Sequence, residues 1–68
     1  MNIVKAKALK PGALVRCPAD RGDLPYTGKV TFVGTNESTG SDGKPYVWIN
    51  VRNPLNGRES VWPSNRLG

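Results

Sequence analysis

Aromatic and cationic side chains alternate with branched aliphatic ones between residues 46 and 52, which read Tyr-Val-Trp-Ile-Asn-Val-Arg. Side chains of a β-strand point alternately to its two faces, so the three branched aliphatic residues are predicted to face a core (Val47, Ile49 and Val51). Tyr46, Trp48 and Arg52 then share the opposite face. Because aromatic rings stack on bases and cations neutralise phosphates, this face is predicted to bind nucleic acid.

Five further cations are candidates for phosphate contact. Lys29 and Arg58 would lie on strands next to the 46–52 segment. Lys5, Lys7 and Lys10 belong to residues 1–10, which contain no acidic residue and are predicted to form a basic N-terminal arm or a short extra strand. The net charge of +5, from 10 Lys and Arg against 5 Asp and Glu, suits a polyanionic partner, although it also serves solubility.

The residue types that several kinds of catalysis require are missing from the sequence. There is no histidine, which excludes an imidazole general base, a Ser-His-Asp triad and a histidine-ligated metal. Cys17 alone cannot form an internal disulfide or a zinc site, and its apolar neighbours predict a small buried side chain. Asp20 and Asp23 share a loop and are expected to be solvated turn residues. We therefore expect a protein that is not an enzyme and uses no cofactor or metal.

Turn-forming residues divide the 68-residue chain into short segments, since it contains 8 glycines and 6 prolines. Strands are predicted at about residues 13–17, 29–33, 46–52, 58–62 and 66–67. In the second of these, alternation predicts that Val30 and Phe32 face inward. Five short strands in a single domain at residues 11–68 suit a small closed β-barrel, because closure leaves no exposed sheet edges.

The C-terminal third of the chain resembles a Src-homology-3 domain. The resemblance rests on Trp48, Gly57 and the run Val61-Trp62-Pro63-Ser64-Asn65-Arg66-Leu67, where that family has a tryptophan strand, a glycine turn and a Pro-Ser-Asn-Tyr turn. It implies an all-β, five-stranded Src-homology-3-like barrel with a short 3-10 turn near residues 63–65. It also implies a candidate partner groove, with Asp20 and Asp23 as acids of the long loop beside it. The resemblance carries over Trp48, Pro63 and Asn65 as groove residues. Trp62 and Arg66 complete the candidate groove, although Arg66 stands where that family has the groove tyrosine.

The overall layout is similar to that of the plasmid-borne type II dihydrofolate reductases, which are Src-homology-3-like barrels that form tetramers around one central pore. The similarity runs from Gly12 through the Tyr26–Val30 segment to Leu67. Their active surface uses a Val-Gln-Ile-Tyr run, and the corresponding residues here are Glu59-Ser60-Val61-Trp62. Ser60 therefore stands where that family has the glutamine that contacts both ligands.

Three functions of different classes remain open on this basis. A nucleic-acid-binding module is favoured, with DNA and RNA both open as partners. A protein-interaction module is the second, because exposed aromatics with arginine also form protein hot spots. A folate reductase of the type II kind is the third. The oligomeric state is open, and so is whether Trp48 and Trp62 are exposed or packed together.

The N-terminal lysines occupy the place where a signal peptide needs its apolar region, and no apolar run approaches the length of a membrane span. These features predict a cytoplasmic protein that does not partner with a membrane. The short reading frame would suit a phage or another mobile element.

Overall fold

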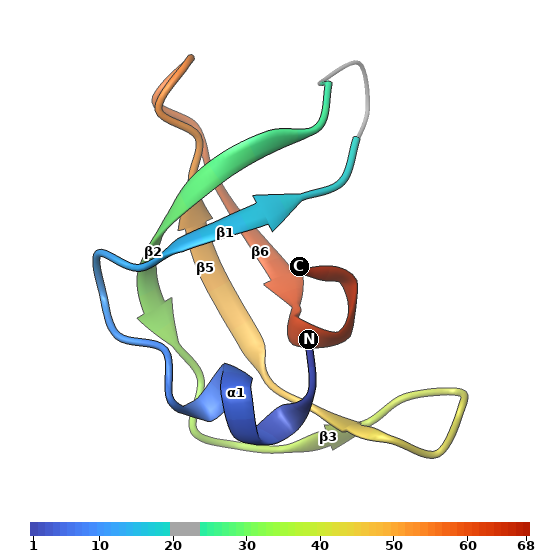
Figure 1. The fold of residues 1–68 in the computed structure, drawn as a ribbon. Coiled ribbons are helices and arrows are strands. Elements are labelled where there is room, and N and C mark those ends of the chain that lie inside the picture. Colours follow the sequence, from blue (N-terminus) through green and yellow to red (C-terminus); the bar gives the residue numbers. More distant parts are fainter. Residues whose placement is uncertain (20–23) are drawn as a thin grey trace.

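A twisted antiparallel sheet makes up most of the molecule in the computed structural model, which describes residues 1–19 and 24–68 (Figure 1). In sheet order its strands are β1 (Leu14–Cys17), β2 (Tyr26–Val33), β5 (Trp48–Arg52) and β6 (Glu59–Pro63). A small second sheet pairs β3 (Ser38–Thr39) with β4 (Pro45–Tyr46). The helix α1 (Ile3–Lys7) precedes the sheet, and the 3-10 turn η1 (Ser64–Arg66) follows it. The protein is therefore mostly β, as its sequence predicts.

The 46–52 segment has the two-faced pattern that its sequence predicts. Val47, Ile49 and Val51 are fully buried, whereas Trp48 and Arg52 are exposed. The segment is not one continuous strand, because the half-buried Tyr46 belongs to β4 and Val47 lies between β4 and β5. The alternation of branched and ring-bearing residues thus correctly separates the core side of β5 from its solvent side.

The core consists of buried side chains from α1, the long strands and the residues beside them. Cys17 is fully buried in it, as predicted for a small apolar side chain. Trp62 is also buried, with 5 % of its surface exposed, and its indole Nε1–H donates a 3.3 Å hydrogen bond to the Tyr26 hydroxyl. The full set is Ala6, Val15, Cys17, Tyr26, Val30, Val47, Ile49, Val51, Trp62 and Leu67.

Residues 1–10 differ from the arm or extra strand that was predicted. The Asn2 side chain accepts a 2.8 Å hydrogen bond from the Lys5 backbone N–H and so caps a five-residue helix. Ala6 on this helix is fully buried, and Ile3 and Leu9 pack against the core. In Figure 1, α1 covers the lower end of the molecule, next to the β3–β4 hairpin. Apolar contacts therefore hold this segment in place, although its lysines remain in solvent.

The prediction that Phe32 faces inward is wrong. Val30 is buried and pairs with Val51. Phe32, two residues later on β2, pairs with Asn50, which directly precedes Val51 on the antiparallel strand β5. Two residues of β2 thus advance the pairing by one residue of β5, which is a β-bulge at Thr31. The bulge shifts the alternation by one position, so Phe32 turns to the solvent side with 57 % of its surface exposed.

The sheet is not closed into a barrel. The predicted last strand at 66–67 is absent from the described residues, because the chain after Pro63 turns into η1 at Ser64–Arg66, close to the predicted 63–65. Beyond η1, Gly68 and Arg16 exchange two backbone hydrogen bonds of 3.0 Å. Gly68 therefore lies along the edge of β1 that is not paired with β2. The Met1 ammonium donates to the Leu67 carbonyl at 2.9 Å, so the two chain ends lie together (Figure 1).

Within residues 1–19 and 24–68, no helix has the length and apolar character needed to cross a lipid bilayer.

Candidate functional site

The side of β2, β5 and β6 that faces away from the core is termed the outer face. Strand register arranges its side chains in three rows across the sheet. One row is charged and two are mainly apolar or aromatic. The residues of the outer face are Lys29, Thr31, Phe32, Trp48, Asn50, Arg52, Glu59, Val61 and Pro63.

The apolar part of the outer face exposes two rings and a branched side chain. Phe32 and Val61 flank Asn50 from the neighbouring strands, with 57 % and 55 % of their surfaces exposed. Trp48 lies two residues from Asn50 on β5 and is 44 % exposed. The half-buried Tyr46 meets Trp48 edge to face, with ring centroids 5.5 Å apart and planes at 81°. This contact limits the freedom of the Trp48 ring and leaves part of it open to a ligand.

Gly34 permits the close approach of β2 to β5 at this point. Its N–H donates a 2.7 Å hydrogen bond to the Trp48 carbonyl oxygen. A Cβ atom at position 34 would lie 2.9 Å from that same oxygen, closer than real side chains come. The lack of a side chain at position 34 therefore allows the Trp48 backbone to pack closely against the end of β2.

The charged part of the outer face lies at the other end of β5. Arg52 stands between Lys29 on β2 and Glu59 on β6 in the strand register. Glu59 Oε1 accepts a 2.7 Å hydrogen bond from the Thr31 hydroxyl. The ion pair found in the described part of the chain joins Lys7 to Glu37, so Lys29 and Arg52 are not bonded to a carboxylate there. Both cations are thus available to an anionic ligand.

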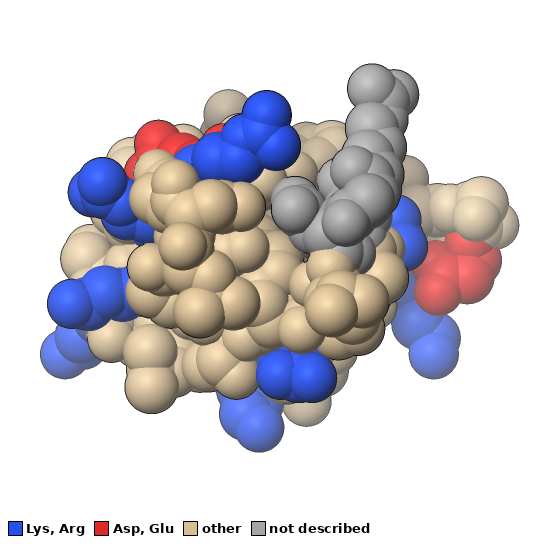
Figure 2. Space-filling model, turned by 90° about the horizontal axis from the view of Figure 1, so that it is seen from above, with Lys and Arg blue, Asp and Glu red and all other residues tan. Residues whose placement is uncertain are grey.

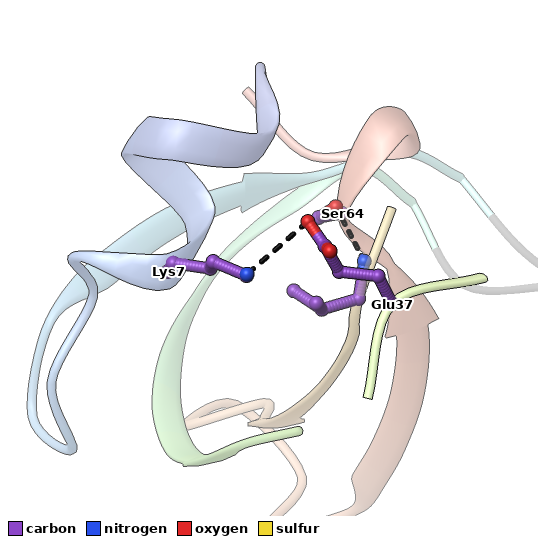
Figure 3. A network of polar contacts seen from close by, with 4 residues as sticks. Lys7, Glu37 and Ser64 are labelled. Atoms are coloured by element: carbon purple, nitrogen blue, oxygen red, sulfur yellow. Dashed lines mark hydrogen bonds and ion pairs between the residues drawn. The ribbon is translucent and has the colours of Figure 1, made fainter. Parts of the chain in front are cut away.

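Three other predicted phosphate-binding lysines do not join the outer face. Lys5 and Lys7 lie on α1, and Lys10 follows it. The Lys7 ammonium is 3.1 Å from Glu37 Oε1, an exposed pair visible in Figure 3. Seen from above, the cationic side chains lie at separate places around the molecule with uncharged surface between them (Figure 2). The prediction that residues 1–10 extend the binding surface as an arm therefore finds no support in their position.

Arg58 lies beside the outer face, in the turn that joins β5 to β6. Its backbone N–H donates to the Asn56 side chain at 2.9 Å, and its carbonyl accepts from the Asn53 N–H at 2.8 Å. These bonds fix the backbone, and the exposed side chain precedes Glu59. Arg58 is thus close to the charged row but is not part of it.

The candidate partner groove is divided in the structure. Trp48 and Pro63 are opposite each other on the outer face, whereas Asn65 and Arg66 belong to η1. Trp62 is not a groove residue, because it is buried and the Arg66 guanidinium lies 5.5 Å from its ring centroid. Asp20 and Asp23, the predicted acids of this groove, lie outside the described residues.

A cavity of about 180 Å³ lies between the start of α1 and the β3–β4 hairpin. Met1, Ile3 and Pro45 supply apolar walls, and Asn65 reaches its edge. The cavity shares no residue with the outer face and lacks the exposed rings found there.

Two buried side chains have perturbed ionisation. Burial raises the pKa of the Cys17 thiol above its ordinary value of 9.0, although hydrogen bonding with Tyr26 opposes the shift. Burial likewise raises the pKa of the Tyr26 hydroxyl above 10.0. Both groups therefore stay protonated at neutral pH. Among residues 1–19 and 24–68, no three metal-ligating side chains gather into a possible metal site.

Comparisons of the chain with protein-family models, with curated proteins and with solved structures give no match.

The sites predicted from the sequence left out five of the nine outer-face residues, which are Thr31, Phe32, Asn50, Glu59 and Val61. No residue type marks the bulge at Thr31, so strict alternation assigns Phe32 to the core. The exposure of Val61 follows from the burial of Trp62, because neighbouring residues on a strand face opposite sides of the sheet. The sequence did not show whether Trp62 is exposed or buried.

Proposed function

We propose that this protein is a non-enzymatic module that binds nucleic acid on its outer face. Trp48 on this face and the adjoining Tyr46 would supply the stacking surface. Lys29 and Arg52, with Arg58 beside them, would supply the phosphate contacts. The observation that carries the proposal is that one sheet face combines the exposed Trp48 ring with two cations not bonded to a carboxylate in the described residues. Nucleic-acid-binding sheets need this combination.

The scaffold that we propose for this module is a five-stranded Src-homology-3-like barrel. Support comes from the order β1-β2-β5-β6 and from the 3-10 turn after Pro63. Further support comes from the two hydrogen bonds between Gly68 and Arg16, because a fifth strand that closed the sheet would have to pair with β1. In such a barrel the outer face of β2, β5 and β6 points to solvent while the core is enclosed.

A protein partner is the second candidate. Phe32 and Val61 are exposed apolar side chains next to Arg52, and such clusters also form the centres of protein interfaces. A folate reductase receives less support, because Trp62 stands in place of the last residue of that active run and is buried.

A salt titration of affinity tests the proposal. With three phosphate contacts, the slope of log K against log salt concentration should lie between about −2 and −3. Replacing Lys29 by Gln should reduce the size of this slope by about one. The matched control is Lys44→Gln, an exposed lysine in the β3–β4 loop, which should leave the slope unchanged. Absence of binding at low salt would refute the proposal, and so would binding that does not respond to salt.

A further inference from the structure

The bulge at Thr31 gives the outer face a second stacking ring. Phe32 on β2 pairs with Asn50, and Trp48 is two residues from Asn50 on the same face of β5. The two side chains are therefore diagonal neighbours across adjacent strands, a separation of roughly 7–8 Å between their backbones. About half of the surface of each side chain is exposed. Phenylalanine and tryptophan side chains are usually buried, so two exposed ones on the same face suggest a contact surface.

We propose that the ligand of the outer face is a single-stranded nucleic acid, with one unpaired base on Phe32 and a neighbouring base on Trp48. This inference rests on the proposed function and specifies its ligand. Two rings on adjacent strands can each accept one base, because every base presents an aromatic face and stacking does not depend on its identity.

The charged row sets the path of the sugar–phosphate backbone. Lys29 and Arg52 lie beyond Thr31 and Asn50, on the side away from Trp48. Glu59 lies next to Arg52 on β6, where its carboxylate repels phosphate. The backbone is therefore drawn toward β2 and β5 and kept from β6. From Trp48 to Arg52, β5 is about 13 Å long at 3.3 Å per residue. Tyr46 of β4 lies against Trp48 at its start, so the outer face suits a short site of a few nucleotides.

A duplex fits the outer face poorly. Paired bases are already stacked on each other and offer no face to Phe32 or Trp48. A duplex also presents two lines of phosphates, whereas the free cations of this face occupy a single row beside an acid. Its backbone would press against Phe32 and Val61, where the phosphates would lose water without gaining a cation or a hydrogen-bond donor.

Fluorescence anisotropy with labelled oligonucleotides tests this inference. The probes are a 12-nucleotide oligouridylate, the corresponding oligothymidylate, and a 12-base-pair DNA duplex, all at one salt concentration. Both single strands should bind at least tenfold more tightly than the duplex, and the comparison of the two single strands shows whether RNA or DNA is preferred.

Variants of Phe32 separate stacking from apolar contact. Phe32→Ala and Phe32→Leu should each weaken single-strand binding about tenfold, because both remove the ring. Phe32→Tyr should retain it, which also shows that position 32 tolerates substitution. The matched control is Leu55→Ala, an apolar residue that is 85 % exposed in the turn after β5 and lies off the outer face. An amide NMR spectrum of each variant verifies folding.

Each result decides a separate claim. Tight single-strand binding that Phe32→Leu impairs supports the inference. Equal or tighter binding of the duplex overturns the inference and leaves the proposed function standing. Failure of all three probes to bind overturns both, and leaves a protein as the partner of the exposed rings.

Discussion

Ser64 and Val47 are joined by two hydrogen bonds in opposite directions. The Ser64 backbone N–H donates to the Val47 carbonyl at 2.9 Å. The Val47 N–H donates to the Ser64 hydroxyl oxygen at 3.2 Å, which is the bond dashed at Ser64 in Figure 3. Both residues are buried, and Val47 directly precedes Trp48. The turn η1 thereby fixes the start of β5 and with it the position of the exposed indole.

Replacing Ser64 by Ala should lower the free energy of unfolding by about 1–3 kcal/mol, because the buried Val47 N–H loses its acceptor. Urea denaturation measures the effect. The control Ser41→Ala changes an exposed hairpin residue and should stay within about 0.5 kcal/mol. Equal stability of the two variants would show that the bond does not hold the turn to β5.

Replacing Trp48 by Ala should weaken single-strand binding by a factor of about 5 to 150, equivalent to 1–3 kcal/mol for one stacked base. Trp48→Phe keeps a ring and should retain most of the affinity. Val4→Ala is a suitable control, because Val4 is 76 % exposed on α1 and lies off the outer face. A loss of affinity with Val4→Ala that matches that of Trp48→Ala would place the site on α1 instead.

Glu59→Gln should strengthen nucleic-acid binding about two- to fivefold at low salt, since it removes a negative charge beside Arg52. The Gln carbonyl can still accept from the Thr31 hydroxyl, so the bulge should be preserved. The gain should diminish at high salt as charges are screened. Glu37→Gln, away from the outer face, is the control. Weaker binding with Glu59→Gln would mean that the carboxylate contacts the ligand directly.

Gly28→Ala should destabilise the protein by about 1–3 kcal/mol. A Cβ at this buried position would overlap the Val51 side chain, and Val51 is a stiff, fully buried residue of β5. Gly68→Ala provides the matched control, because there the nearest atom is the Arg16 Cβ at an ordinary 3.7 Å. Thermal unfolding of both variants would reveal the difference, and similar melting temperatures would contradict the packing described for β2 against β5.

The stability of the protein should fall as the pH rises above about 9. Burial raises the Cys17 pKa in the folded state, so the unfolded thiol ionises first, near 9.0, and the unfolded state gains stability as pH rises toward the folded pKa. The loss begins near pH 9.0 and grows until the folded thiol ionises as well. Urea midpoints at pH 7.5 and 9.5 under reducing conditions should differ less for Cys17→Ala than for the natural protein. An equal difference in both proteins would assign the pH dependence to other groups.

Part of the fold could be predicted from the sequence because alternation is a local signal. Branched residues at 47, 49 and 51 can only be buried together if the residues between them face solvent, and the structure agrees. The Ser64 turn also follows from the Pro-Ser-Asn run. The closed barrel stays a proposal, because two bonds from Gly68 pair it with β1 without forming a strand.

The rest depended on contacts that no local pattern records. Phe32 faces solvent because β2 gains one residue relative to β5 at Thr31, and only the pairing of the two strands shows it. The helix α1 is too short to form on its propensity alone and depends on the burial of Ala6. The buried Trp62 indole has its hydrogen-bond acceptor in the Tyr26 hydroxyl, which is 36 positions away in the chain.

Titration of the two indole N–H signals in an amide NMR spectrum tests the central claim most directly. On addition of a 12-nucleotide oligouridylate, the indole signal of Trp48 should shift along with the amides of Phe32, Lys29 and Arg52. The indole of Trp62 is bonded to Tyr26 inside the core and should stay in place. Shifts confined to α1 and the β3–β4 hairpin, with the Trp48 signal unmoved, would contradict a binding site on the outer face.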